Sequence, residues 1–190
     1  RLVMSTRFNI LETPLTGLRV LQRKPFGDQR GHLERLYCNK ELQALAEGRA
    51  ISQINHTLTV ARGTVRGMHF QHSPCAEIKF VNCLRGEVFD VAVDLRDGSP
   101  TFLRWYAVTL SADNHKTLVI PEGFAHGFQT LTDGCEMLYL HTAAFNPDAE
   151  GGLNVRDPRL AIEWPLPVAG MSPRDAAHPP LNESFTGLAT

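Results

Sequence analysis

From about residue 51 to residue 140, short apolar runs alternate with turns rich in glycine and aspartate. Residues 88–95 show the pattern most clearly, because every second side chain is apolar and would lie on one face of a strand: Phe89, Val91, Val93 and Leu95. Further strands are expected at residues 102–110, 117–120, 127–131 and 135–141. Short strands at such regular spacing predict an all-β sandwich or barrel.

The first fifty residues are less regular. Residues 17–21 alternate weakly, which predicts an edge strand, and residues 26–37 contain a turn rich in glycine and aspartate that leads into another strand. Asn39 is expected to cap a short helix that runs to about Glu47, and Gly48 is well placed to end it. No other segment predicts a helix so clearly.

The strand pattern stops after residue 145. Residues 146–190 hold seven of the twelve prolines, which predicts an irregular tail rather than a second domain. Ile162 and Trp164 are apolar anchors through which this tail would dock on the barrel. We therefore expect a single domain over residues 1–190, with a barrel core at about 51–142.

The overall composition narrows the class of protein. Nineteen basic and twenty acidic residues nearly cancel, so no global field favours nucleic acid or an anionic membrane, and we expect the protein to bind neither. No apolar run approaches the length needed to span a bilayer. The four cysteines are widely spaced and form no CxxC pair, which argues against a structural zinc site and for free thiols in a reducing compartment. A cytoplasmic location is expected.

Two segments place a histidine on a strand beside glycines. They are Gly63–Gln71, which contains His69, and Pro121–His126. Together with Glu77, they are similar to the two motifs of the cupin double-stranded β-helix, in which metal-binding members carry His-x-His and Glu in the first motif and a last His in the second.

The second histidine of that first motif is replaced here by Gln71, a poor ligand for a divalent transition metal. A metal site formed by His69, Glu77 and His126 is therefore weakened but stays open. The alternative for His69 is general acid–base chemistry, which suits an imidazole. The third interpretation is a core histidine whose ring is hydrogen-bonded to backbone groups. It is weakened because Lys79 and Tyr139, which can carry charge or transfer protons, are expected close to His69.

Longer motifs follow one another in a fixed order along the chain. They are Arg66–Gln71, Ala76–Lys79, Gly86–Phe102, Pro121–Phe128, Asp157-Pro158 and Trp164-Pro165. This series resembles dTDP-4-dehydrorhamnose 3,5-epimerase and its relatives, in register from about residue 17 to about residue 175.

The resemblance implies a jelly-roll barrel of the cupin type that acts as a homodimer without metal or other cofactor. It also implies an enzyme of deoxysugar biosynthesis that epimerises a nucleotide-linked 4-keto-6-deoxyhexose at C3, C5 or both. The ketone at C4 acidifies the hydrogens at C3 and C5, so a base can remove one of them and leave an enolate.

The resemblance also assigns roles to residues. His69 would be the base, and Asp175, delivered by the docked tail, would orient it and favour its charged form. Tyr139 would return a proton to the opposite face of the sugar. Lys79, with Arg66 or His126 nearby, would stabilise the enolate oxygen. Without the resemblance, Tyr139 could equally be a barrel tyrosine anchored by its hydroxyl, and Lys79 a solvated strand lysine.

One of these assignments conflicts with strand alternation. His69 and Gln71 should share one face of their strand, and Arg66 should lie on the other. Arg66 reaches the site only if a bulge at Gly67 changes the alternation, which a glycine would permit.

Contacts with the nucleotide-sugar are implied at a further set of positions: Arg30, Gln53, Asn55, Phe145 and Glu150. Arg30 suits a diphosphate, which an arginine can bind with two parallel hydrogen bonds. The other interpretation of Arg30 is a surface turn stabilised by the side chain of Asp28. Phe145 stands where many members have a stacking tyrosine.

Leu33 and Arg35 stand where many members carry an aromatic and an acidic residue that help to hold the base. A dTDP-linked sugar is expected, with a CDP-linked sugar as the alternative. Two other functions stay open, a metal-dependent cupin oxygenase or isomerase and a sugar-nucleotide binder without catalytic activity. The sequence does not decide between inversion at C3, at C5 or at both.

Overall fold

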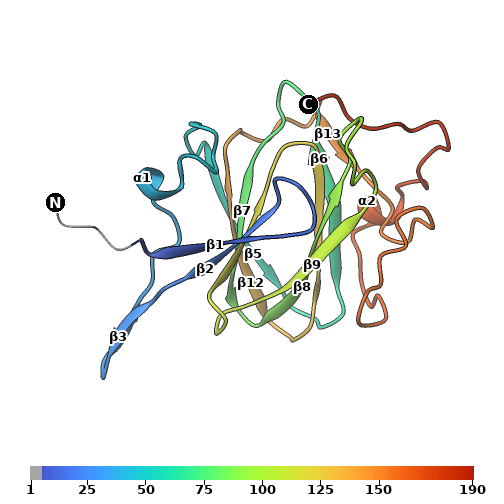
Figure 1. Ribbon diagram of the computed structural model, residues 1–190. Helices are drawn as coiled ribbons and strands as arrows, with labels where there is room; N and C mark the ends of the chain where they lie inside the picture. Colours follow the sequence, from blue (N-terminus) through green and yellow to red (C-terminus); the bar gives the residue numbers. More distant parts are fainter. Residues whose placement is uncertain (1–5) are drawn as a thin grey trace.

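The computed structural model describes residues 6–190, which form almost entirely β-structure (Figure 1). The strands are β1 (Phe8–Glu12), β2 (Arg19–Arg23), β3 (Phe26–Asp28), β4 (Gly31–Leu33), β5 (Gln53–Thr59), β6 (Val65–Gln71), β7 (Lys79–Arg85), β8 (Glu87–Asp94), β9 (Trp105–Ser111), β10 (Lys116–Ile120), β11 (Phe124–Thr130), β12 (Cys135–His141) and β13 (Glu150–Gly152). The two short helices are α1 (Asn39–Leu42) and α2 (Pro173–Ala176).

Two antiparallel sheets form the barrel. One has six strands in the order β1-β2-β10-β7-β12-β5, and the other has five in the order β13-β6-β11-β8-β9. Strands β3 and β4 make a separate hairpin that extends away from the barrel (Figure 1). The predicted all-β jelly-roll architecture is confirmed. The barrel core was predicted at about residues 51–142, but β1, β2 and β13 lie outside this range and also pair into the two sheets.

Three apolar clusters hold this architecture together. The first lies between the two sheets and includes Phe128, whose burial stabilises the fold by about 1.5–3 kcal/mol. The second lies between the five-stranded sheet and the C-terminal tail, which covers that sheet in Figure 1. The apolar face predicted for residues 88–95 lies in this second cluster, as do the anchors Ile162 and Trp164, so the docked tail is confirmed. The third cluster packs α1 against the six-stranded sheet.

The N-terminal elements differ from the prediction in two ways. The strand predicted at 17–21 is β2, which lies inside the sheet because β1 pairs with its outer side. Helix α1 ends at Leu42 instead of Glu47, and its N-cap is Cys38 rather than Asn39, with no side-chain cap. A helix this short has little stability of its own, so the packing of Leu42 on the sheet decides where it forms.

Strand boundaries elsewhere shift by a few residues. Strand β9 begins at Trp105 rather than at residue 102, because Phe102 N–H donates to Ser99 O in a turn (3.1 Å) and Leu103 has φ +61°. Strand β11 begins at Phe124, three residues before the predicted start. Within residues 6–190, neither helix has the length or the apolar character needed to cross a bilayer.

Candidate active site

A cavity of about 610 Å³ opens between the two sheets. Its size is typical of sites for small molecules. Strands of both sheets and the C-terminal tail contribute to its wall. The predicted site residues that line it are Gln53, Asn55, Arg66, His69, Lys79, His126, Tyr139, Phe145, Glu150 and Asp175. Side chains from Gln53 to Asp175, more than a hundred positions apart in the sequence, therefore line the same cavity.

His69 on β6 is paired with Asp175 from the tail. Its Nε2 lies 2.6 Å from Asp175 Oδ1, and Gly67 N–H donates to Oδ2 of the same carboxylate (3.2 Å). Burial opposes the charge of Asp175, but the His69 imidazole and the Gly67 N–H outweigh it and hold the pKa of this carboxyl below its usual value. The carboxylate is thus ionised at neutral pH and fixes the orientation of the imidazole.

Local sequence explains why Asp175 points this way. Ser172 is the N-cap of α2, and its Oγ accepts a hydrogen bond from Asp175 N–H (3.0 Å). Pro173 follows in the first turn, where its fixed φ favours helix and its missing N–H costs nothing. The resulting single turn presents the Asp175 side chain, which is only 4% exposed, to the His69 ring.

The bulge expected at Gly67 is present. In the pairing of β6 with β11, His69 is opposite His126 and Arg66 is opposite Phe128, so three steps on β6 match two steps on β11. The extra residue brings Arg66 and His69 to the same cavity. Arg66 Nε donates to Thr59 Oγ1 (2.8 Å), which holds its guanidinium at the cavity wall.

Replacing Gly67 by alanine should therefore be costly. Gly67 has φ +124°, and an added Cβ would lie 2.6 Å from Gly127 Cα and 2.8 Å from His126 O. Strain and overpacking together predict a loss of at least about 2 kcal/mol in the free energy of unfolding, measured by chemical denaturation. Gly98→Ala is the matched control, because Gly98 also has a positive φ (+68°) but no other atom of residues 6–190, beyond its two chain neighbours, lies within 4 Å of the added Cβ. Equal losses in the two variants would contradict this account of the bulge.

Tyr139 enters the cavity from the opposite sheet. It lies on β12, and its hydroxyl is 3.4 Å from Thr57 Oγ1 on the neighbouring strand β5. Its ring lies edge-on to the ring of His126, with centroids 6.0 Å apart. Burial among protein atoms raises the pKa of Tyr139 well above its ordinary value, so the phenol keeps its proton at neutral pH. The Tyr139 hydroxyl therefore lies in the cavity and carries a proton at neutral pH, as a general acid must.

Lys79 supplies a positive charge to the same cavity. Its Nζ lies 3.1 Å from Glu77 Oε1, and Glu77 Oε2 accepts a hydrogen bond from Gln71 Nε2 (2.8 Å). Burial would raise the pKa of Glu77, but the nearby His141 and Lys79 outweigh it and hold this pKa below its usual value. The carboxylate therefore stays charged and positions the ammonium group of Lys79.

His126 has its own acidic partner inside the barrel. Its Nε2 lies 2.8 Å from Asp90 Oδ1, and the side chain of Asp90 is fully buried. Burial raises the pKa of Asp90 despite the opposing effects of His126 and Lys79.

The three residues of the alternative metal site are each engaged with a different side chain. His69 is paired with Asp175, Glu77 with Lys79, and His126 with Asp90, as described above. Gln71, at the position of the second cupin histidine, also accepts a hydrogen bond from Asn146 N–H (2.7 Å). These donor atoms form ion pairs and hydrogen bonds with separate partners, an arrangement that fits proton chemistry better than ligation of one ion.

Arg30 is the predicted site residue that the structure does not bring to the cavity. It lies at the tip of the β3–β4 hairpin with its side chain 89% exposed, and Arg30 Nε is 3.0 Å from Asp28 Oδ1. Asp28 Oδ1 also accepts the Arg30 N–H (2.9 Å), so the turn is stabilised by its own aspartate. Arg30 therefore does not reach the cavity of its own chain, because the hairpin leads away from the barrel (Figure 1), and its contact with a nucleotide-sugar stays a prediction.

Two cavity residues were missed from the sequence. Arg174 Nη1 lies 2.9 Å from Glu150 Oε2, and its Nη2 is 3.2 Å from His69 Nε2. His141 lies 3.7 Å from Glu77 Oε1 through its Nδ1. The signals were present, since Arg174 directly precedes Asp175 and His141 follows Tyr139 by two residues on the same face of its strand.

Comparison with known proteins identifies relatives over most of the chain. Residues 12–183 match the family model of dTDP-4-dehydrorhamnose 3,5-epimerase. The enzyme of that name from Salmonella typhimurium is 42% identical over 179 residues, which cover 93% of this chain and 97% of the relative.

Solved structures agree with this match. The dTDP-6-deoxy-D-glucose-3,5-epimerase of Legionella pneumophila, in complex with dTDP-4-keto-L-rhamnose, is 40% identical with a TM-score of 0.85, covering 90% of this chain and 91% of that one. The dTDP-4-dehydrorhamnose 3,5-epimerase of Bacillus anthracis, with TDP and PPi bound, is 38% identical with a TM-score of 0.88, covering 92% of this chain and 99% of that one.

Proposed function

The chain belongs to the dTDP-4-dehydrorhamnose 3,5-epimerase family, and we propose that it inverts C3, C5 or both in a dTDP-linked 4-keto-6-deoxyhexose. The observation that carries this proposal is the placement of His69 and Tyr139. They come from strands of different sheets and line one cavity, so a sugar ring between them can lose a proton on one face and gain one on the other.

In the proposed reaction, His69 takes the proton from the carbon next to the C4 ketone. The electrons of the broken C–H bond form the enolate, whose negative charge lies on the C4 oxygen. Asp175 stabilises the imidazolium that results, through the 2.6 Å contact with Nε2. Lys79 stabilises the enolate oxygen.

Tyr139 then completes the inversion. Its hydroxyl donates a proton to the opposite face of the carbon, so the C–H bond reforms with the other configuration. The raised pKa of Tyr139 keeps this proton available at neutral pH. His69 and Tyr139 both exchange protons with solvent before the next turnover.

Two arginines at the cavity support a diphosphate-linked substrate. Arg66 and Arg174 both line the wall, and their fixed charge suits phosphate oxygens. Gln53 and Asn55 on β5 and the exposed ring of Phe145 are placed to contact the nucleoside. The complexes of the relatives with dTDP-sugar and TDP favour thymidine, although Leu33 and Arg35 depart from the family pattern.

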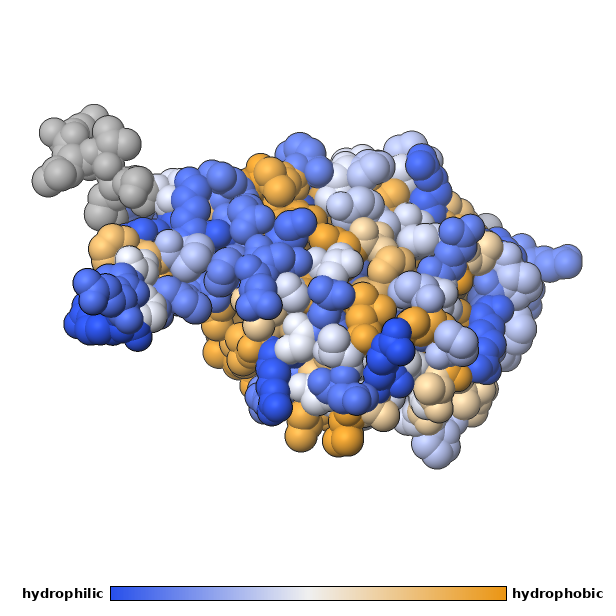
Figure 2. Space-filling view, turned by 90° about the horizontal axis from the view of Figure 1, so that it is seen from below, coloured by the Kyte–Doolittle hydropathy of each residue, from blue (hydrophilic) through white to orange (hydrophobic). Residues whose placement is uncertain are grey.

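We propose that the active form is a homodimer. The strands β1 and β5 are the open edges of the six-stranded sheet, and apolar side chains lie exposed along these edges and on the hairpin: Ile10, Leu11, Phe26, Leu33, Ile54, Leu58 and Val60. Figure 2 shows apolar side chains gathered in patches on one face of the molecule. A second copy would cover such edges, and the projecting hairpin could carry Arg30 to its cavity. Light scattering should give the mass of two chains, and a monomer would contradict this proposal.

A cytoplasmic location is also proposed. All four cysteines are free, and Cys83 and Cys135 are buried, as expected where thiols are kept reduced. Fractionation of the source cells would test this location, and recovery of the protein from an exported fraction would contradict it.

The reaction can be tested by solvent exchange. We expect the dTDP-4-keto-6-deoxy sugar, incubated with the protein in deuterated water, to gain deuterium at C3, at C5 or at both, beyond the exchange seen without protein. Uptake at one carbon would identify a single-site epimerase, and absence of uptake would contradict the proposal and favour a binding protein. Exchange should survive treatment with a chelator, since loss would favour the metal-dependent alternative. The CDP-linked sugar is tested in parallel, and the substrate that gains deuterium faster identifies the preferred nucleotide.

A further inference from the structure

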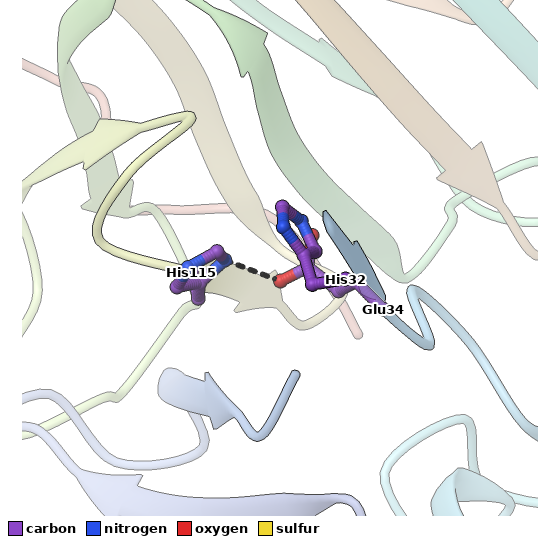
Figure 3. A group of neighbouring side chains, drawn as sticks. All are labelled: His32, Glu34 and His115. Atoms are coloured by element: carbon purple, nitrogen blue, oxygen red, sulfur yellow. Dashed lines mark hydrogen bonds and ion pairs between the residues drawn. The ribbon is translucent and has the colours of Figure 1, made fainter. Parts of the chain in front are cut away.

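A second group of titratable side chains lies outside the cavity, where the β3–β4 hairpin returns to the barrel. His32 lies on β4, Glu34 follows that strand, and His115 lies in the turn between β9 and β10. Figure 3 shows the two imidazoles and the carboxylate pointing toward one another. One ligand atom from each side chain lies within 4.8 Å of the other two.

Glu34 and His115 are held in place by the barrel. Glu34 Oε1 accepts from Arg23 Nε (2.7 Å) and lies 2.8 Å from His115 Nδ1. Arg23 is only 2% exposed, and its Nη1 donates to Asn82 Oδ1 (2.8 Å) and Thr117 Oγ1 (2.8 Å). The carboxylate therefore has a rigid support of the kind that orients metal ligands.

His32 is the adjustable member of the group. It is exposed, and its ring lies edge-on to that of His115 with centroids 5.5 Å apart. Among residues 6–190, the hydrogen-bond contacts of Glu34 are all made by Oε1, which is also the oxygen that faces His115 and is placed to bind an ion between the two side chains.

The distances are close to those that a zinc ion requires. With bonds of about 2.0–2.1 Å, the ligands of a tetrahedral zinc lie about 3.3 Å apart. The Glu34–His115 separation of 2.8 Å is near this value. The longest separation, up to 4.8 Å, would have to shorten by about 1.5 Å, which the exposed His32 side chain can supply by rotation.

The ligand types select the kind of ion. Two imidazoles and one carboxylate suit Zn²⁺ and similar divalent transition ions, whereas Ca²⁺ and Mg²⁺ prefer several oxygens. The guanidinium of Arg23 offsets the single carboxylate charge, which further disfavours ions that bind mainly through charge.

We propose that His32, Glu34 and His115 form a site for Zn²⁺ or a similar divalent transition ion. The ion replaces the proton between His115 and Glu34, takes His32 as its third protein ligand and leaves a fourth position to water. Bound in this way, it ties the β3–β4 hairpin, with Arg30 at its tip, to the turn between β9 and β10. This site does not depend on the proposed epimerase activity.

The test is a titration of untagged, metal-free protein with Zn²⁺ by calorimetry. We expect one ion per chain in the wild type and an affinity lower by about tenfold or more in His32→Ala and His115→Ala. His56→Ala is the matched control, because His56 is another exposed histidine paired with a glutamate, at 3.0 Å from Glu136 Oε2, and it should bind like the wild type. Because His32 is exposed, its variant should fold even if His115→Ala does not.

A second readout follows the hairpin itself. Backbone hydrogen exchange of β3 and β4, measured by mass spectrometry, should be slowed by Zn²⁺ in the wild type and in His56→Ala but not in His32→Ala. Ca²⁺ and Mg²⁺ should have no effect. Failure of the wild type to bind Zn²⁺, or equal affinity in the wild type and His32→Ala, would overturn the proposal.

Discussion

Replacing His69 by alanine is expected to lower kcat by about 10²–10⁴-fold, the usual contribution of a general base. KM should change much less, because Lys79 and the two cavity arginines stay in place. The rate is measured by following the product sugar by NMR. His72→Ala is the control, since it removes an exposed imidazole that does not line the cavity. A loss of less than about tenfold in His69→Ala would contradict the role of base.

Asp175→Asn is measured in the same experiment, because it distinguishes the contribution of the base, His69, from that of the residue that positions it. The amide can keep a contact with His69 but loses the negative charge, so we expect a smaller loss of kcat than in His69→Ala. The folded-state pKa of Asp175 is lowered, so its ionised carboxylate contributes stability above the ordinary carboxyl pKa, and this contribution is lost as pH falls through the lowered value. In Asp175→Asn, the free energy of unfolding should no longer show this part of the decrease at acid pH. The variant keeps His69, so the difference from the wild type reports the Asp175 carboxylate alone.

Tyr139→Phe should separate proton removal from inversion. Without the hydroxyl, His69 can still form the enolate and exchange its proton with solvent, but the opposite face receives no proton. We expect deuterium uptake to continue while epimerised product falls by about 10²–10⁴-fold. Both quantities are read from one NMR spectrum of the sugar in deuterated water.

The fold should tolerate this change. Within the described part of the chain, the Tyr139 hydroxyl makes one hydrogen-bond contact, a long one of 3.4 Å to Thr57 Oγ1, so its loss should cost no more than about 1 kcal/mol of stability. Tyr106→Phe is the control, because Tyr106 packs on the same apolar cluster without lining the cavity. Inversion at the wild-type rate in Tyr139→Phe would show that another group donates the proton.

Much of the barrel could be predicted because strand formation leaves a local trace. Side chains alternate between the two faces of a strand, so the buried face of residues 88–95 is visible as every second apolar residue. The same rule made the bulge at Gly67 a condition that could be stated in advance. Helix α1 had no comparable trace, since its four residues depend on packing against the sheet.

The sequence by itself determined the all-β architecture and the docked tail, because the alternation of side chains and the turn residues are local properties of the chain. Most of the cavity residues were expected only through the resemblance of the motifs to a family, and Arg174 and His141 were missed. Only the tertiary structure decided which of those residues meet. His69 and Asp175 lie 106 positions apart and are joined by the fold of the tail, whereas Arg30 follows a hairpin away from the site. Contacts of this kind depend on how distant segments pack, and no local pattern of side chains records that packing.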